Sequence, residues 1–128
     1  MKFFYSFVDG KVTTVNDGKD TSYFNLIRRP KSTAGFTFSD QVSKKLLFNI
    51  SINTVGKQKD LSYDSNYNEV QITLKNYILC NAYVEYKIAK ERIKLFVDLR
   101  NVTNTKFNEV YGFNTMGFNV YGGFRFNY

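Results

Sequence analysis

Hydrophobic and polar residues alternate with a period of two along most of the chain, and the pattern is clearest at the C-terminus. There, every second position is apolar or glycine, while the positions between them are largely polar. Because successive side chains of a β-strand point to opposite faces, this pattern predicts a strand with one apolar and one polar face. The apolar positions of this segment are Phe118, Val120, Gly122, Phe124, Phe126 and Tyr128.

The same alternation recurs upstream, and helical periodicity is nowhere sustained. It predicts an all-β fold, an antiparallel up-and-down meander of about six strands. The segment that begins near residue 92 has its apolar positions at Ile93, Leu95 and Val97, which are expected to share one face. In the long run that begins near residue 70, the even positions from Val70 onward, Cys80 included, are placed on the apolar face. The six strands are expected near residues 2–14, 32–42, 45–57, 70–88, 92–103 and 117–128.

Short and long connections alternate strictly between these strands. Turns near 40–44 and 89–91 are short, whereas the connections near 16–31, 58–69 and 104–116 are long. In a meander this puts every long loop at one end of the sheet, as in outer-membrane barrels. A soluble up-and-down barrel usually has short hairpins at both ends. Most of the segments also reach the roughly nine to eleven residues that a tilted membrane-spanning strand needs, and 70–88 is expected to project beyond the membrane on the long-loop side.

The polar positions of the last strands carry charged side chains. Burying them inside a small soluble barrel would cost several kcal/mol for each unpaired ion, whereas a water-filled lumen removes that cost. Alternation alone leaves the inverse arrangement open, a soluble small β-barrel that binds a lipid or other ligand. Six strands are too few to close around such a lumen, so the sheet is expected to be open and to belong to a larger barrel or an oligomer. The residues expected to face the lumen are Lys94, Asp98, Arg100 and Arg125.

Composition narrows the function classes. The chain has 128 residues, 18% of them aromatic, which fits β-structure. It has one cysteine, Cys80, and no histidine, which excludes a disulfide framework, a cysteine-based zinc site and the usual catalytic pairs. We therefore expect no enzyme activity, no cofactor and no metal. The net charge of +7 is spread without a basic block, and Phe124 and Arg125 fall on opposite faces, so no nucleic-acid partner is expected.

Three stretches resemble the C-terminal barrel segment of TonB-dependent outer-membrane receptors, most closely the vitamin B12 (cobalamin) receptor type. Residues 26–31 (LIRRPK) resemble the family's stretch before a late strand. Residues 101–107 (NVTNTKF) resemble its signature after the penultimate strand, and residues 110–117 (VYGFNTMG) resemble its final extracellular loop. The likeness covers almost the whole chain in order. The departures are Pro30, where a small residue can occur, and Phe118, where arginine is common and which bears on ligand identity.

The resemblance implies the last six or so strands of a transmembrane barrel of about twenty-two strands around a plug. Residues 1–128 would then be one C-terminal barrel part in the outer membrane of a Gram-negative bacterium, without the plug, the earlier strands or a signal peptide. The implied function is part of the energised uptake of cobalamin or a ferric siderophore. The implied partners are outer-membrane lipid, the plug and remaining barrel, the TonB complex through the missing N-terminal part, and the barrel-assembly machinery.

The resemblance also suggests roles for individual residues. Val120, Phe124, Phe126 and Tyr128 resemble the C-terminal signal that the barrel-assembly machinery recognises. The lumen-facing charges would grip the plug. Arg28 and Arg29 lie near the extracellular side, where a guanidinium can donate to a ligand phosphate or carboxylate. The alternative for this pair is a solvated loop or a lumen-wall ion pair with Asp98 or Glu85. Tyr111 and Phe113 are candidate ligand contacts in the last long loop; packing against a membrane-interface girdle is the alternative.

Overall fold

The computed structural model is an all-β sheet that describes residues 1–16, 18–24, 27–88 and 92–127. Six strands form the main sheet in the order β1-β4-β5-β8-β9-β10, and each is antiparallel to its neighbours. Two separate hairpins, β2–β3 and β6–β7, extend from it. The strands are β1 (Lys2–Phe7), β2 (Lys11–Asn16), β3 (Lys19–Phe24), β4 (Ser32–Asp40), β5 (Leu46–Val55), β6 (Gln58–Tyr63), β7 (Glu69–Leu74), β8 (Tyr77–Ile88), β9 (Ile93–Arg100) and β10 (Asn119–Phe126).

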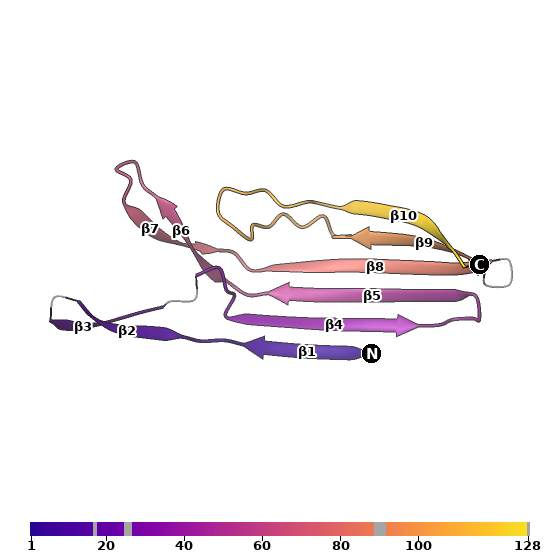
Figure 1. Ribbon diagram of the computed structural model, residues 1–128, viewed down its shortest axis with the longest axis horizontal. Helices are drawn as coiled ribbons and strands as arrows, with labels where there is room; N and C mark the ends of the chain where they lie inside the picture. Colours follow the sequence, from indigo (N-terminus) through magenta and orange to yellow (C-terminus); the bar gives the residue numbers. More distant parts are fainter. Residues whose placement is uncertain (17, 25–26, 89–91, 128) are drawn as a thin grey trace.

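The long connections all leave the same end of the sheet. Figure 1 shows the β2–β3 hairpin, the β6–β7 hairpin and the β9–β10 loop at one end, and the β4–β5 turn and both chain termini at the other. This arrangement confirms the predicted meander and its asymmetric loops. The predicted turn at 89–91 falls outside the described residues. Among those that are described, no helix has the length and apolarity needed to cross a membrane.

The strand register places apolar side chains next to each other across the whole sheet. Val84 on β8 lies opposite Val97 on β9, and Leu95 on β9 lies opposite both Tyr86 on β8 and Phe124 on β10. These side chains remain in contact with solvent: Phe124 is 74% exposed and Leu95 is 45% exposed. Together with the exposed side chains of β1, β4 and β5 they form one continuous surface, which we call the apolar face. It includes Phe3, Tyr5, Phe7, Phe36, Ile50, Ile52, Ile78, Val84, Tyr86, Leu95, Val97, Val120, Phe124 and Phe126.

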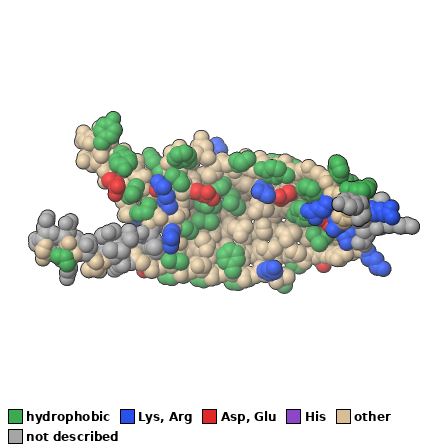
Figure 2. All heavy atoms as spheres, viewed as in Figure 1, with side chains coloured by type: hydrophobic (Ala, Val, Ile, Leu, Met, Phe, Trp, Pro, Cys, Tyr) green, Lys and Arg blue, Asp and Glu red, His purple; other side chains and the backbone are tan. Residues whose placement is uncertain are grey.

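The opposite surface, the polar face, carries the charged side chains of the last strands. Figure 2 shows acidic and basic side chains lying beside each other along the sheet. Among the described residues, the buried hydrophobic side chains are Leu74 and Tyr77, and neither lies in the middle of the apolar face. The sheet therefore does not enclose an apolar interior, and the closed soluble barrel that alternation left open is not the observed fold. The predicted open sheet is confirmed.

Two of the six predicted strands are wrong in extent. Segment 2–14 is broken after Phe7, because the last rung to β4, from Val8 N to Lys31 O at 2.8 Å, is followed by a separate hairpin that begins at Lys11. Segment 70–88 is broken at Lys75 and Asn76.

The second break also changes which side chains share a face. Leu74 and Tyr77 both approach Phe107: Leu74 lines a groove with it, and the Tyr77 and Phe107 ring centroids lie 4.3 Å apart. An unbroken strand would put positions 74 and 77 on opposite faces. The prediction that all even positions from Val70 to Ile88 share the apolar face is therefore wrong upstream of residue 76.

Aromatic rings fill the space above two glycines in the outer strand pairs. Phe4 lies opposite Gly35, where a Cβ added at Gly35 would overlap the Phe4 ring. Phe96 lies opposite Gly123, where an added Cβ would come within 3.0 Å of Phe96 Cζ. Since glycine has no side chain, the ring can cover the strand backbone. Both pairs lie on the polar face and hold the first and last strands against their neighbours.

Candidate functional site

The polar face contains two clusters of charged side chains. Glu85 on β8 accepts a hydrogen bond from the Tyr83 hydroxyl at 2.9 Å, and its other oxygen lies 3.7 Å from Lys94 Nζ on β9. Lys94 in turn lies opposite Arg125 on β10. Tyr83 stacks on Phe96 with a centroid distance of 6.2 Å. This cluster offers one carboxylate and two cations on the same surface.

The second cluster lies nearer the long-loop end. Arg100 donates through Nε to Asp98 Oδ2 at 3.0 Å, and its guanidinium carbon lies 5.1 Å from the centre of the Tyr121 ring. The Arg100 side chain is still 59% exposed, against 24% for Asp98. A shallow recess of about 320 Å³ adjoins the pair and is lined also by Asn49 and Asn81. Lys94, Asp98, Arg100 and Arg125 thus share the polar face, and their partner beyond this sheet stays a prediction.

At the end of the sheet from which the long connections leave, one buried carboxylate links all three of them through hydrogen bonds. Asp60 on β6 has a relative exposure of 0%. Its Oδ1 accepts from Arg28 Nε at 2.8 Å, in the β3–β4 connection, and from its neighbour Leu61 N at 2.9 Å. Its Oδ2 accepts from Tyr111 N at 2.6 Å, in the β9–β10 loop. We call Asp60, Arg28 and the Tyr111 amide the Asp60 hub.

The electrostatics of the hub favour a charged Asp60. Burial acts to raise the pKa of the carboxyl, but hydrogen bonds from the Tyr111 amide, the Arg28 guanidinium and the Leu61 amide outweigh it and hold the pKa below its usual value of 3.8. Arg28 has a left-handed backbone with φ of 59°, and its own N–H donates to Lys59 O at 2.7 Å. The hub therefore holds Arg28 in a conformation that this residue type rarely adopts.

A second layer of contacts fixes the β9–β10 loop on the polar face. Asn101, 4% exposed and with φ of 49°, donates its N–H to Asn81 Oδ1 at 3.0 Å and exchanges two hydrogen bonds with the backbone of Thr105. Farther along the loop, Gln58 Nε2 donates to Glu109 O at 2.7 Å. The loop is thus bonded to β6 and β8 along much of its length.

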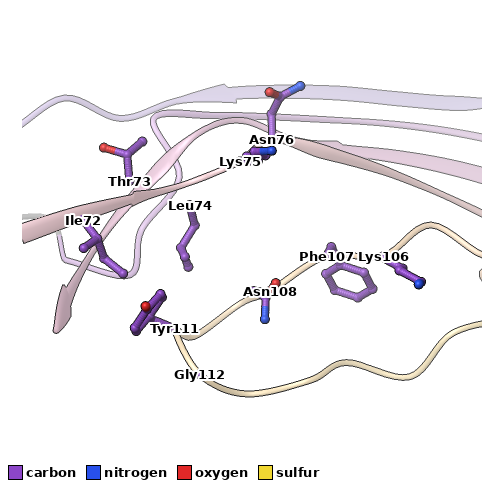
Figure 3. Close-up of a pocket in the computed structure, with 10 residues that line it drawn as sticks. All are labelled: Ile72, Thr73, Leu74, Lys75, Asn76, Lys106, Phe107, Asn108, Tyr111 and Gly112. Atoms are coloured by element: carbon purple, nitrogen blue, oxygen red, sulfur yellow. The ribbon is translucent and has the colours of Figure 1, made fainter.

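A groove of about 440 Å³ separates β7 from the β9–β10 loop. Figure 3 shows Ile72 and Leu74 pointing from β7 towards the loop, with Tyr111 across from them. Lys75 and Lys106 add two cations to its lining. Ammonium groups beside aromatic rings and amides suit an anionic ligand with a planar part.

The structure separates the four predicted ligand contacts. Arg28 belongs to the Asp60 hub, where its carboxylate partner is Asp60. The alternative ion pair with Asp98 or Glu85 is therefore wrong. Arg28 also lines a recess of about 340 Å³ with Gln58 and Glu109. Arg29 is exposed. Tyr111 lines the groove and is 54% exposed, whereas Phe113 is 69% exposed and outside the groove lining.

The residues of the predicted assembly signal lie on one face. Val120, Phe124 and Phe126 belong to the apolar face and are all more than half exposed, at 54%, 74% and 58%. Tyr128 falls outside the described residues. Whether the assembly machinery recognises this strand stays a prediction.

The sequence pattern did not point to Asp60, and it marked Asn101 only as the first residue of the 101–107 stretch, not as an anchor of the β9–β10 loop. Asp60 lies 32 positions from Arg28 and 51 from Tyr111, and no local pattern signals a contact across such distances. The available signal was weak: a lone carboxylate between Lys59 and Leu61 in a stretch expected to be a loop. Within the described residues, no group of three or more acidic, cysteine or histidine side chains is placed to hold a metal ion.

Comparison with known proteins shows a likeness of fold. No protein-family model matches the chain, and a search of curated proteins finds no match. Among solved structures, the ferripyoverdine receptor of the outer membrane of Pseudomonas aeruginosa, bound to ferripyoverdine, superposes with a TM-score of 0.67 at 16% identity, over 84% of this chain and 16% of that chain. The siderophore receptor PirA from Acinetobacter baumannii superposes with a TM-score of 0.66 at 15% identity, over 98% of this chain and 27% of that chain.

A third solved structure gives the same result. A mutant of the ferric enterobactin receptor PfeA from Pseudomonas aeruginosa superposes with a TM-score of 0.61 at 17% identity, over 91% of this chain and 21% of that chain. The chain therefore spans between 16% and 27% of the length of these receptors. Its six-stranded sheet is arranged like a segment of an outer-membrane β-barrel wall.

Proposed function

We propose that this chain is the C-terminal wall segment of a TonB-dependent outer-membrane receptor. The observation that carries the proposal is the pairing of an exposed apolar face with a charged polar face on an open sheet whose fold matches outer-membrane receptors at TM-scores up to 0.72. An apolar face towards lipid and a polar face towards a water-filled lumen make this arrangement stable. In water alone, the same surface would associate through its edges and its apolar face.

In this function the segment supplies wall, lumen and loops. The free edges of β1 and β10 pair with the remaining barrel strands, and the exposed polar-face cations bind a plug. Arg100 suits that role because its side chain is 59% exposed although Nε is bonded to Asp98. Energy reaches the plug through the TonB complex, and strand β10 with Phe124 and Phe126 presents the signal for the barrel-assembly machinery. These partners follow from the family resemblance together with the fold.

The transported ligand belongs to the class of large, scarce nutrients. Siderophore receptors are prominent among the structures of similar fold, and cobalamin is suggested by the sequence stretches around residues 26–31 and 110–117. The groove between β7 and the β9–β10 loop, with Lys75, Lys106 and Tyr111, contributes one wall of the entry path. Its two cations favour an anionic ligand such as a ferric siderophore over neutral ones.

The decisive test of the proposal is the DNA upstream of the codon for Met1. We expect the reading frame to continue through roughly sixteen further alternating strands, a plug and a signal peptide. A genuine start site and a terminator that bracket these residues would refute the receptor assignment for this product.

Membrane placement has its own test, because the chain carries a natural probe. Cys80 on β8 lies opposite Ile52 on the apolar face. A polarity-sensitive fluorophore on Cys80 should be quenched by nitroxide-labelled lipid and not by iodide in water. The matched control is Ser51→Cys in a Cys80→Ala background, which places the probe on the polar face and should reverse both results. Quenching of Cys80 by iodide alone would contradict a lipid-facing surface.

A further inference from the structure

Two buried side chains of β6 tie the β9–β10 loop to the hairpin, next to the groove that separates this loop from β7. Gln58 Nε2 donates to Glu109 O at 2.7 Å, and Asp60 Oδ2 accepts from Tyr111 N at 2.6 Å. Gln58 is 7% exposed and Asp60 is 0% exposed. Both bonds reach the backbone of the loop, so they fix its path and not only one of its side chains. We call Gln58 and Asp60 the two tethers.

Each tether lies directly beside a residue of the groove wall. In the β6–β7 pair, Gln58 lies opposite Leu74 and Asp60 lies opposite Ile72. Residues opposite each other in a strand pair point to the same face, and Figure 3 shows Ile72 and Leu74 pointing towards the loop. One strand of the hairpin therefore supplies the bonds that hold the loop, and the other strand supplies the wall that faces it. The distance across the groove thus depends on the tethers.

The opposite wall of the groove is the Tyr111 ring, which a turn presents. Phe113 N donates to Val110 O at 3.2 Å, and Gly112 has φ of 78°. Tyr111 is thus the first central residue of a turn whose second central residue needs the left-handed conformation that glycine adopts readily. Tyr111 is 54% exposed, so packing of its ring does little to hold it. Its place depends on the turn and on the bond from its N–H to Asp60.

The tethers themselves are outside the groove lining, so a ligand in the groove would not touch them. It would lie between Ile72 and Leu74 on one side and the Tyr111 ring on the other. An aliphatic wall opposite an aromatic ring suits a flat ring inserted between the two. Lys75 and Lys106 belong to the same lining and favour an anionic substituent on that ring.

We propose that Gln58 and Asp60 are positioning residues that set the width of this groove and thereby select flat aromatic anions over globular anions. The proposal rests on the groove being one wall of the ligand path given under Proposed function. The tethers act through the loop, because they hold Tyr111 at a fixed distance from Ile72. Removal of either tether lets the loop move away from β7, and the groove then accepts groups that are thicker than a ring.

The test compares the binding of two matched probes to the purified protein in non-ionic detergent, by ligand-observed NMR with a detergent blank. Naphthoate is flat and adamantane carboxylate is globular, whereas both have one carboxylate and the same number of carbon atoms. The readout is the ratio of their dissociation constants. Partial unfolding lowers the fraction of binding-competent protein and weakens both probes by the same factor. A merely structural role of the tethers would therefore leave the ratio unchanged.

The test variants are Gln58→Leu and Asp60→Asn, each of which removes one tether at nearly constant volume. The matched control is Asn101→Ala, because Asn101 holds the start of the same loop through two hydrogen bonds to the Thr105 backbone, outside the groove. The site control is Tyr111→Ala, which removes one wall of the groove and reports whether the probes bind there.

We expect the natural chain to bind naphthoate about tenfold more tightly than adamantane carboxylate. In each tether variant this preference should fall to about twofold or less, because the globular probe gains access, while Asn101→Ala should keep the natural ratio. The natural preference in either tether variant that folds would overturn the proposal, and so would the lack of a preference in the natural chain. A ratio that Tyr111→Ala leaves unmoved would place the probes outside the groove and would also overturn it.

The result also separates this proposal from the proposed function. If the ratio changes as expected but the labelled Cys80 fails to meet lipid, the receptor assignment fails and the positioning role of the tethers stands. If Cys80 meets lipid and the ratio stays constant in the tether variants, the positioning proposal alone fails.

Discussion

Replacing the buried carboxylate of the Asp60 hub tests whether one side chain holds the three long connections together. Asp60→Asn keeps the volume but replaces one acceptor oxygen with an NH₂ group. If the amide oxygen remains on Arg28 and Leu61, the NH₂ group faces the Tyr111 N–H, which now lies 2.6 Å from Oδ2. Two donors then meet, and the Tyr111 amide loses its acceptor.

The magnitude follows from the bonds that are lost. A hydrogen bond to a charged acceptor contributes about 1.5–3 kcal/mol. The ion pair with Arg28 adds less, because that side chain is 56% exposed and is screened by water. We therefore expect the hub to lose about 2–3 kcal/mol of local stability, which corresponds to between about 30-fold and 150-fold faster opening.

Hydrogen exchange at the Tyr111 amide is the direct assay. In Asp60→Asn, exchange at Tyr111 should accelerate by that factor, while amides in the middle of β5 and β8 stay unchanged. The matched control is Asp40→Asn, which removes a carboxylate from an exposed position at the other end of β4. Equal protection of Tyr111 in both variants would show that the loop is held without Asp60 and would refute the reasoning.

Acid should reproduce the effect of the substitution. The folded pKa of Asp60 is lowered, so its contribution to stability is fully present above the unfolded value of 3.8 and is lost as the pH falls below it and through the folded pKa. Protection of Tyr111 should therefore decline below about pH 3.8 in the natural chain and stay flat in Asp60→Asn. A decline of equal size in both would assign the acid effect to another group.

Three further substitutions test other parts of the structure. Val97→Lys on the apolar face should cost about 2–4 kcal/mol in lipid vesicles, measured as a lower denaturant midpoint, while Ser51→Lys on the polar face should leave the midpoint nearly unchanged. Gly35→Ala should cost about 1–3 kcal/mol through overlap with Phe4 and speed amide exchange in β1, an effect that Phe4→Ala should relieve. Asn101→Ala leaves buried loop amides without a partner, at about 1–3 kcal/mol, and should make the β9–β10 loop a preferred site of limited proteolysis; resistance equal to that of the natural chain would contradict its anchoring role.

The main sheet could be predicted because its information is local. Alternation assigns Leu95 and Val97 to one face and Lys94 to the other without knowledge of any partner strand, and the register bears this out. The fold class, the open sheet and the asymmetric connections follow from the same pattern. Alternation with a period of two fails at Lys75 and Asn76, because these two residues lie between β7 and β8. The even positions before them therefore lie on a different face from the even positions after them.

The site was less predictable because its contacts are long-range. The sequence suggests that Arg28 meets a ligand or a lumen carboxylate, but it does not show that Asp60 approaches from a hairpin 32 positions away. Strand β6 and the turn that follows it were expected as a loop, since residues 58–69 mix charged and polar types without a clean period, whereas most of β7 was expected as the start of the strand at 70–88. The strands of the β6–β7 hairpin are stabilised by pairing with each other and by the hub, and neither effect is visible in a local window.

The even number of strands in the main sheet limits how such a chain can lengthen during evolution. Figure 1 shows that the polypeptide enters β1 and leaves β10 at the same end. Inserting a single strand would reverse the direction of every later strand. The later hairpins would then project from the other end of the sheet, and the chain would leave β10 at the opposite end. Inserting a hairpin preserves both. Duplication by pairs of strands is therefore the step that keeps all inherited loops at their original end of the sheet.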